Sequence, residues 1–364
     1  MQKTSAWPLA LIYVGLVLYA SLYPFAEWRD QGIAPWAFLA APLTRYWTWF
    51  DVAANVAGYA PLGFLLTLGA LRTGRGTHAV LVTTLCAAGL SLIMEAMQSY
   101  LPARVPSNVD LVLNVLGAWL GAVVAALLEK MGAIAQWNRF RERWFVEHAR
   151  GGLVLLALWP VALMFPASVP FGLGQVLERL ELALVDTLED TPFLEWLPLR
   201  EVELEPLLPL AELVCVMLGV LIPCLLGYCI IRSMLRRAIF ALLVAAVGVS
   251  VTALSSALSY SPEHAWPWLT LPVQVGIVSA LSFALPLVLI PRRICAALLL
   301  LALGVYLSLL NQAPTDPYFA QTLQSWEQGR FIRFHGLAQW LGWLWPYAVM
   351  VYVLTVVGSR SPQN

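Results

Sequence analysis

The stretch DVAANVAG, residues 51–58, sets an aspartate, an asparagine and a glycine in a run that is otherwise apolar. A second stretch, DLVLNVLG, residues 110–117, repeats Asp, Asn, Val and Gly at the same four positions. On a helix, the Asp, the Asn four residues later and the Gly seven residues later share one face. Each copy therefore predicts an apolar helix that carries one polar stripe.

The composition of the whole chain indicates a membrane protein. Of its 364 residues, 60% are hydrophobic and 12% are charged, with a mean hydropathy of +0.76. A soluble domain usually carries about twice that charged fraction. The 16 tryptophans suit anchoring at a membrane–water interface. We therefore expect an all-α, polytopic integral membrane helical bundle.

The apolar runs predict ten transmembrane helices, at ~20 residues per span. If the N-terminus is cytoplasmic, fourteen Lys and Arg residues fall in inside loops and seven in outside loops. This bias follows the positive-inside rule, so both termini are predicted to be cytoplasmic. The predicted spans lie near 7–25, 47–71, 78–100, 108–130, 151–170, 207–231, 237–258, 270–290, 292–310 and 337–357.

A basic stretch divides the predicted helices into two groups. Residues 1–130 hold four helices, 131–150 form a basic cytoplasmic linker, and 151–364 hold six helices of unassigned role. The outside loop 171–206 of the second group is acidic. Leucines recur in it at helical spacing, which leaves two alternatives: an amphipathic helix on the membrane, or a solvated acidic loop. These leucines are Leu177, Leu180, Leu184 and Leu188.

Polar side chains of the first four predicted helices converge on one leaflet. The second and fourth helices enter from outside and the third runs outward, so their polar residues share one depth. Ionised carboxylates facing lipid are costly, so these groups should face the bundle or a water-filled cavity. We expect an outward-facing polar pocket, with Arg104 as its lid or counter-ion. The candidate ligand-binding residues are Asp51, Asn55, Glu95, Gln98, Arg104, Asp110 and Asn114.

Glycines in the same helices predict close helix packing. Gly117 and Gly121 are four residues apart, a spacing that lets two membrane helices approach each other closely. The candidate packing residues are Gly58, Gly63, Gly117 and Gly121.

Two longer segments carry a family resemblance. DVAANVAGYAPLGFLL, residues 51–66, and SLIMEAMQSYLPARVPSNVDLVLNVLGAWLGA, residues 91–122, resemble the VanZ-like family of membrane proteins. The shared patterns are GY-x-PLG, E-x-x-Q and R-x-x-S-x-x-D-x-x-x-N-x-x-G, and the resemblance covers about residues 45–130. It implies a cell-envelope role in the bacterial cytoplasmic (inner) membrane and a link to resistance to the glycopeptide teicoplanin. It implies no particular reaction.

Three classes of function remain open. The first is binding or movement of an envelope amphiphile, either a lipid-linked saccharide or a polyprenyl phosphate, through the arginine, carboxylates and amides. The second is an intramembrane enzyme that uses carboxylates as an acid–base pair or to hold Mg²⁺ or Ca²⁺. The third is a non-catalytic scaffold of interhelical hydrogen bonds.

Other features of the sequence narrow the partners. The candidate cluster contains no histidine, and the chain has no G-x-S-x-G, no H-E-x-x-H and no glycine-rich phosphate loop. The sequence therefore leaves catalytic residues unassigned and indicates no cofactor and no resident metal. Its basic residues lie in short predicted loops, which does not suggest nucleic acid. The expected partner is a membrane lipid or a lipid-linked envelope precursor.

Overall fold

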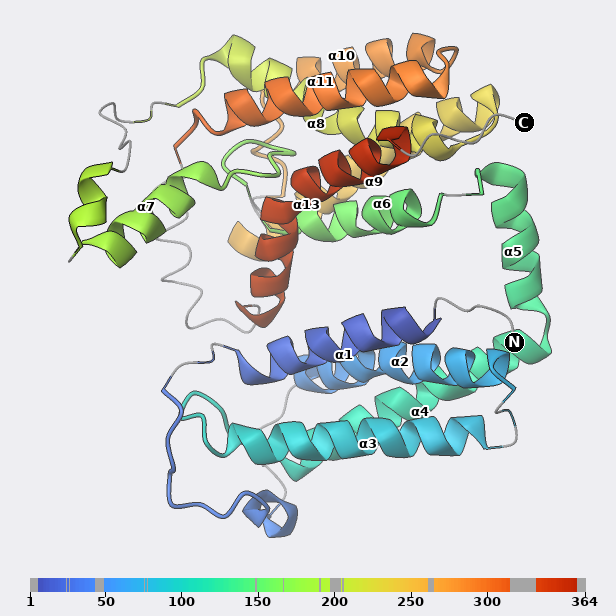
Figure 1. Ribbon diagram of the computed structural model, residues 1–364, viewed down its shortest axis with the longest axis vertical. Coiled ribbons are helices and arrows are strands. Elements are labelled where there is room, and N and C mark those ends of the chain that lie inside the picture. The colour runs from blue at the N-terminus through green and yellow to red at the C-terminus, as the bar shows by residue number, and fades with distance from the viewer. Residues whose placement is uncertain are drawn as a thin grey trace. The chain divides into compact units, whose positions relative to one another are not determined.

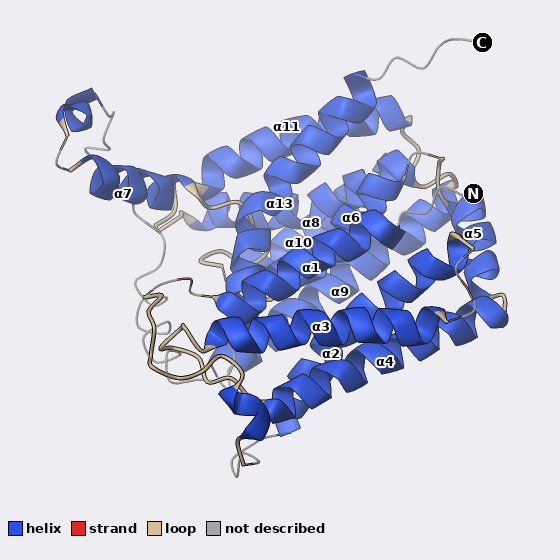
Figure 2. Ribbon diagram, turned by 60° about the horizontal axis from the view of Figure 1, so that its bottom comes forward, coloured by secondary structure: helices blue, strands red, loops and turns tan. Residues whose placement is uncertain are grey.

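The computed structural model is all-α (Figure 2). Its described residues form twelve α-helices and two short 3-10 helices. The chain divides into two compact units, an N-terminal unit of Met1–Phe140 and a C-terminal unit of Arg141–Asn364. The residues that the structure describes are 6–23, 25, 27–42, 49–74, 76, 78–147, 149–165, 167–189, 191–196, 204, 206–260, 265–314 and 332–358.

The N-terminal unit is built from four helices, and each runs antiparallel to the next along the chain. They are α1 (Ala6–Leu22), α2 (Trp49–Arg72), α3 (Ala79–Gln98) and α4 (Asn108–Lys130), with the 3-10 helix η1 (Ala37–Ala40) between the first two. Helices α1 and α3 run in one direction and α2 and α4 in the other (Figure 1). The C-terminal ends of α1 and α3 therefore meet the N-terminal ends of α2 and α4 at one end of the unit.

Helices α2 and α4 form the most extensive helix contact of the N-terminal unit. Glycines allow it, because a Cβ atom at Gly121 would overlap the carbonyl oxygen of Ala60, and one at Gly63 would overlap that of Ala118. A Cβ at Gly117 would overlap the Val56 carbonyl in the same way. Close approach of the two backbones is thus tied to small residues, as in other membrane helix pairs.

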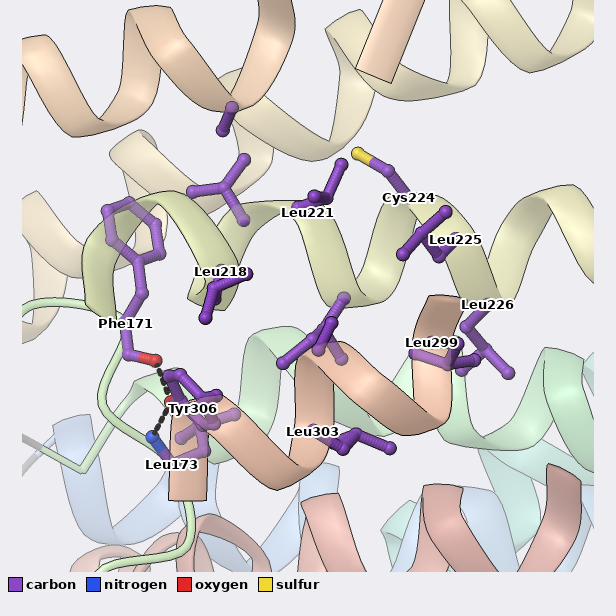
Figure 3. Packing of buried hydrophobic residues seen from close by; sticks show 14 of the residues in the cluster. Phe171, Leu173, Leu218, Leu221, Cys224, Leu225, Leu226, Leu299, Leu303 and Tyr306 are labelled. Atoms are coloured by element: carbon purple, nitrogen blue, oxygen red, sulfur yellow. Dashed lines mark hydrogen bonds between the residues drawn. The ribbon is translucent and has the colours of Figure 1, made fainter. Parts of the chain in front are cut away.

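The C-terminal unit surrounds one buried helix. Helix α8 (Pro209–Ile230) is apolar on all sides, and helices of that kind lie inside a bundle. Leucines of α8 face Leu299 and Leu303 of α11 (Figure 3). The other large helices of the unit are α6 (Arg150–Leu163), α9 (Met234–Tyr260), α10 (Leu271–Leu287), α11 (Arg292–Leu310) and α13 (Ile332–Gly358).

The helix of the span that we expected at 151–170 ends early, and a buried loop follows the span. Helix α6 ends at Leu163, and residues 171–175 that follow are buried without forming a helix. The Tyr306 hydroxyl donates to the Phe171 carbonyl at 2.6 Å and accepts the Leu173 N–H at 2.5 Å (Figure 3). The Asn311 side-chain oxygen accepts the backbone N–H groups of Val176 and Leu177. Irregular backbone inside a membrane bundle requires such protein partners.

Six described helices are long and apolar enough to cross a membrane. They are α2, α3, α4, α8, α9 and α11, and α1, α6 and α10 are shorter apolar helices. With α13, these helices occupy all ten predicted spans. The prediction of an all-α, multi-pass membrane protein is confirmed. The number of spans and the side on which each terminus lies stay predictions.

Two further helices lie in segments expected to be connections. The predicted linker 131–150 contains α5 (Ala133–Trp144), and the predicted acidic loop contains α7 (Leu177–Leu188) and the 3-10 helix η2 (Pro192–Trp196). Of the two alternatives that the leucine spacing left open, the loop thus contains a helix at these leucines. Leu177, Leu180 and Leu184 are exposed on α7, and its contact with a membrane stays a prediction. Residues 197–203 of the loop lie outside the described part.

Candidate functional site

Arg104 and Gln98 bind the C-terminal end of α1. The Arg104 side chain is 7% exposed, and its Nε donates to the Tyr23 carbonyl at 2.9 Å. Its Nη2 donates to the carbonyls of Ala20 at 3.0 Å and Tyr23 at 2.6 Å. The Gln98 amide donates to the Ser21 carbonyl at 3.0 Å. The last carbonyls of a helix have no partner within that helix, so these two side chains satisfy groups that would otherwise be unpaired.

Glu95 performs the matching task at the start of α4. Its carboxylate is 4% exposed and accepts the backbone N–H of Ser107 at 2.9 Å. Ser107 is the N-cap of α4, and its hydroxyl accepts the N–H of Asp110 at 3.3 Å. A negative charge is favourable at a helix N-terminus, where the free N–H groups and the dipole both attract it. An acid of α3 therefore fixes the start of α4.

Asp51 and Asp110 occupy equivalent positions in two parallel helices. Each lies in the first turn of its helix, α2 and α4 respectively, and each is half-buried. Both carboxylates thus sit at the positive end of a helix dipole. They lie at the same end of the unit as Arg104 and Glu95, which agrees with the depth that span order predicts.

A second polar cluster lies deeper, between α2, α3 and α4. The Asn114 amide nitrogen donates to the Ser91 hydroxyl at 2.9 Å, and both side chains are buried. The Tyr59 hydroxyl approaches the Ser91 side chain without reaching hydrogen-bond geometry, and Glu95 lies nearby. Among the described residues, neither the Tyr59 hydroxyl nor the Asn114 carbonyl oxygen has a hydrogen-bond partner. A buried polar atom left unpaired costs about 1–3 kcal/mol.

The predicted site residues thus fall into three groups. Gln98 and Arg104 cap α1, Glu95 and the two aspartates lie at the starts of α2 and α4, and Asn114 lies deeper, between α2, α3 and α4. Asn55 is half-buried, and no described residue hydrogen-bonds its amide. A joint role of the seven candidate residues in binding a ligand stays a prediction. Among the described residues, no three His, Cys, Asp or Glu side chains gather as metal ligands.

Gly58 differs from the other three candidate packing glycines. A Cβ atom at Gly58 would meet open space, and the Gly58 carbonyl instead accepts the Tyr13 hydroxyl of α1 at 2.9 Å. The stripe of α2 that faces α4 contains Val56, Ala60 and Gly63 rather than Gly58.

Tyr59 is a cluster residue that the predicted site does not include. It lies four residues after Asn55 and eight after Asp51, so helical spacing puts it on the same stripe. The sequence also indicates the role of Ser107, because Ser107-x-x-Asp110 has the spacing of a helix N-cap motif.

The geometry describes a multi-pass helical membrane protein whose first four helices enclose a polar cluster. Residues 6–129 match the VanZ/LLP1 family. This range covers helices α1 to α4, except for the last residue of α4. The N-terminal four-helix region is therefore a VanZ/LLP1 family domain. The resemblance seen over about residues 45–130 is confirmed, and the match extends it to the first helix. No curated protein and no solved structure matches the chain.

Proposed function

We propose that the VanZ/LLP1 domain binds the polar headgroup of an envelope amphiphile in the cluster formed by Tyr59, Ser91 and Asn114. The observation that carries this proposal is the pair of buried, unpaired polar atoms, the Tyr59 hydroxyl and the Asn114 carbonyl oxygen. Each side chain is only 5% exposed. A ligand that pairs with both removes a cost that the protein alone leaves in place.

The chemistry of the cluster favours a sugar over a phosphate. A hydroxyl can donate to the Asn114 oxygen and also accept from Tyr59, whereas a phosphate only accepts. The nearby Glu95 carboxylate would repel an anion. The Arg104 guanidinium, which we expected to hold a phosphate, donates instead to carbonyls at the end of α1. Of the two amphiphiles considered, the lipid-linked saccharide therefore fits better than a polyprenyl phosphate.

The depth of the cluster supports a lipid-anchored ligand. Ser91 precedes the end of α3 by seven residues, or about 10 Å along the helix. A group at that depth of a membrane domain is within reach of a molecule that lies in the bilayer. We place the protein in the bacterial cytoplasmic (inner) membrane, with this end of the domain outward.

A scaffold role has support of its own for three of the residues. Glu95, Gln98 and Arg104 each satisfy backbone groups at helix ends. Such contacts explain why these side chains are present without a ligand. They do not explain the unpaired atoms of Tyr59 and Asn114. A ligand-binding role accounts for these atoms, whereas a scaffold role does not.

Tyr59→Phe separates binding from folding. Removing an unpaired buried hydroxyl should leave thermal stability unchanged or higher, while weakening ligand binding about tenfold. Tyr13→Phe is the matched control, because it removes a hydroxyl that does form a hydrogen bond, to Gly58. It should lower stability by about 0.5–1.5 kcal/mol and leave binding intact.

Binding would be measured with purified full-length protein and two probes, a polyprenyl-diphosphate-linked saccharide and the same polyprenyl phosphate without sugar. Glycopeptide susceptibility, to teicoplanin first, would be compared in cells at matched protein abundance. Wild-type saccharide binding by Tyr59→Phe would contradict the proposal and favour the scaffold. Equal binding of the two probes would contradict recognition of the sugar.

A further inference from the structure

One buried arginine joins two turns of the C-terminal unit. The Arg237 side chain, near the start of α9, is 6% exposed. Its Nε donates to the Ile231 carbonyl at 3.2 Å, and its Nη1 donates to those of Val288 and Ile290 at 3.1 and 2.9 Å. The turn between α8 and α9 is thereby held against the turn between α10 and α11.

Three exposed arginines surround this junction. Arg232 lies in the connection between α8 and α9, and its Nε donates to the Phe145 carbonyl at 2.7 Å. Arg292 and Arg293 are the first two residues of α11, directly after the connection between α10 and α11, and both are exposed. Arg292 lies within electrostatic range of Arg232 and Arg237. We call Arg232, Arg292 and Arg293, with Arg237 beneath them, the arginine junction.

In the part of the chain that the structure describes, carboxylates do not balance the charges of the arginine junction. Among the described residues, no carboxylate acts on the Arg292 charge, and neither Arg292 nor Arg293 has an ion-pair partner. The adjoining segment 145–149 holds one acid, Glu147, which is exposed. Arg292 and Arg293 also lie at the N-terminus of α11, where the helix dipole disfavours cations and favours anions. The neighbouring arginines and the helix dipole therefore favour an external anion.

We infer that the arginine junction binds a phosphate group, supplied by the headgroup of an anionic phospholipid. Guanidinium groups bind phosphate oxygens with two parallel hydrogen bonds, and the N–H groups at the start of α11 add donors of the same kind. The junction lies at the ends of three candidate membrane spans, α8, α9 and α11. Phospholipid phosphates occupy that depth of a bilayer, which favours a lipid over free phosphate. This site belongs to the C-terminal unit and does not depend on the proposed headgroup cluster.

The test uses the purified full-length protein in a neutral detergent. Its unfolding temperature is followed by tryptophan fluorescence while phosphatidylglycerol, phosphatidylcholine or inorganic phosphate is added. A lipid that binds the folded state raises this temperature with its concentration. We expect phosphatidylglycerol alone to do so. Arg292→Gln with Arg293→Gln should weaken its apparent affinity on the order of tenfold.

The matched control is Arg139→Gln with Arg141→Gln, which removes the same charge from α5. Wild-type affinity in this control, with loss in the junction double variant, supports the inference. Equal weakening in both would show diffuse attraction and overturn it, as would equal stabilisation by phosphatidylcholine. Equal stabilisation by inorganic phosphate would overturn the lipid assignment. If the double variant does not fold without lipid, Arg293→Gln against Arg139→Gln gives the same comparison.

Discussion

Arg104 illustrates how a single residue can have a role that its position along the chain does not indicate. Span order predicts its depth, and its position between two prolines predicts a loop. Its partners are the carbonyls of Ala20 and Tyr23, which belong to α1. Backbone carbonyls at a helix end carry no sequence signature, so a guanidinium that caps them cannot be distinguished in the sequence from one that awaits a phosphate.

Arg104→Lys should destabilise the N-terminal unit. A single ammonium group cannot reach both carbonyls in the geometry of the planar guanidinium. Because the site is buried, the loss should be about 2–3 kcal/mol, measured as a lower unfolding temperature. At matched amounts of folded protein, saccharide binding should be unchanged. Loss of binding by a variant of wild-type stability would instead return Arg104 to the ligand site.

The elements α2 and α4 use their repeated D-x-x-x-N-x-x-G stripes differently. In α4, Gly117 faces α2 closely, whereas the equivalent Gly58 of α2 faces open space. The stripe that α2 turns to α4 is Val56, Ala60 and Gly63, which the repeat does not mark. The spacing of small residues could therefore predict that α4 packs closely, but not which face of α2 receives it, since α2 has small residues on more than one face.

The repeated aspartates have a common explanation at the level of the helix. Ser107 precedes Asp110 by three residues and caps α4. Thr48 precedes Asp51 by the same three residues, although it lies outside the described part. The repeat therefore extends to [ST]-x-x-D, the signature of a helix start. An acid in the first turn of a membrane helix is explained by this position before any ligand is considered.

Gly121→Ala should weaken the contact between α2 and α4. The added Cβ would overlap the Ala60 carbonyl, and overpacking of this kind costs about 1–3 kcal/mol. Gly58→Ala is the matched control, since its Cβ meets nothing within 4 Å. That change should be neutral or stabilise the helix by about 0.5–1 kcal/mol. Thermal unfolding of the two variants checks the difference, and equal destabilisation would contradict the observed packing.

Across the whole molecule, apolar runs predict where helices occur better than where they end. The segment 151–170 is apolar throughout, yet its helix ends at Leu163, and the chain continues into a buried loop, residues 171–175, which Tyr306 and Asn311 hold. Hydropathy cannot distinguish a buried loop from a membrane helix, because both exclude charges. The hydrogen-bond partners that make the loop possible lie more than 130 residues away along the chain, in α11 and at its C-cap, and the sequence of α11 is that of an ordinary span.

The orientation of the molecule is the prediction that bears on both proposed sites. Fourteen positive residues on one side and seven on the other predict cytoplasmic termini, which puts the headgroup cluster toward the outside and the arginine junction toward the cytoplasm. All five native cysteines are free, so a cysteine-free background breaks no disulfide. In that background, a cysteine at the exposed Glu189 should react with an impermeant thiol reagent in intact cells. A cysteine at the exposed Lys130 is the control and should react only after the membrane is opened. The reverse pattern would invert the molecule, so that the polar cluster would meet cytoplasmic rather than external amphiphiles.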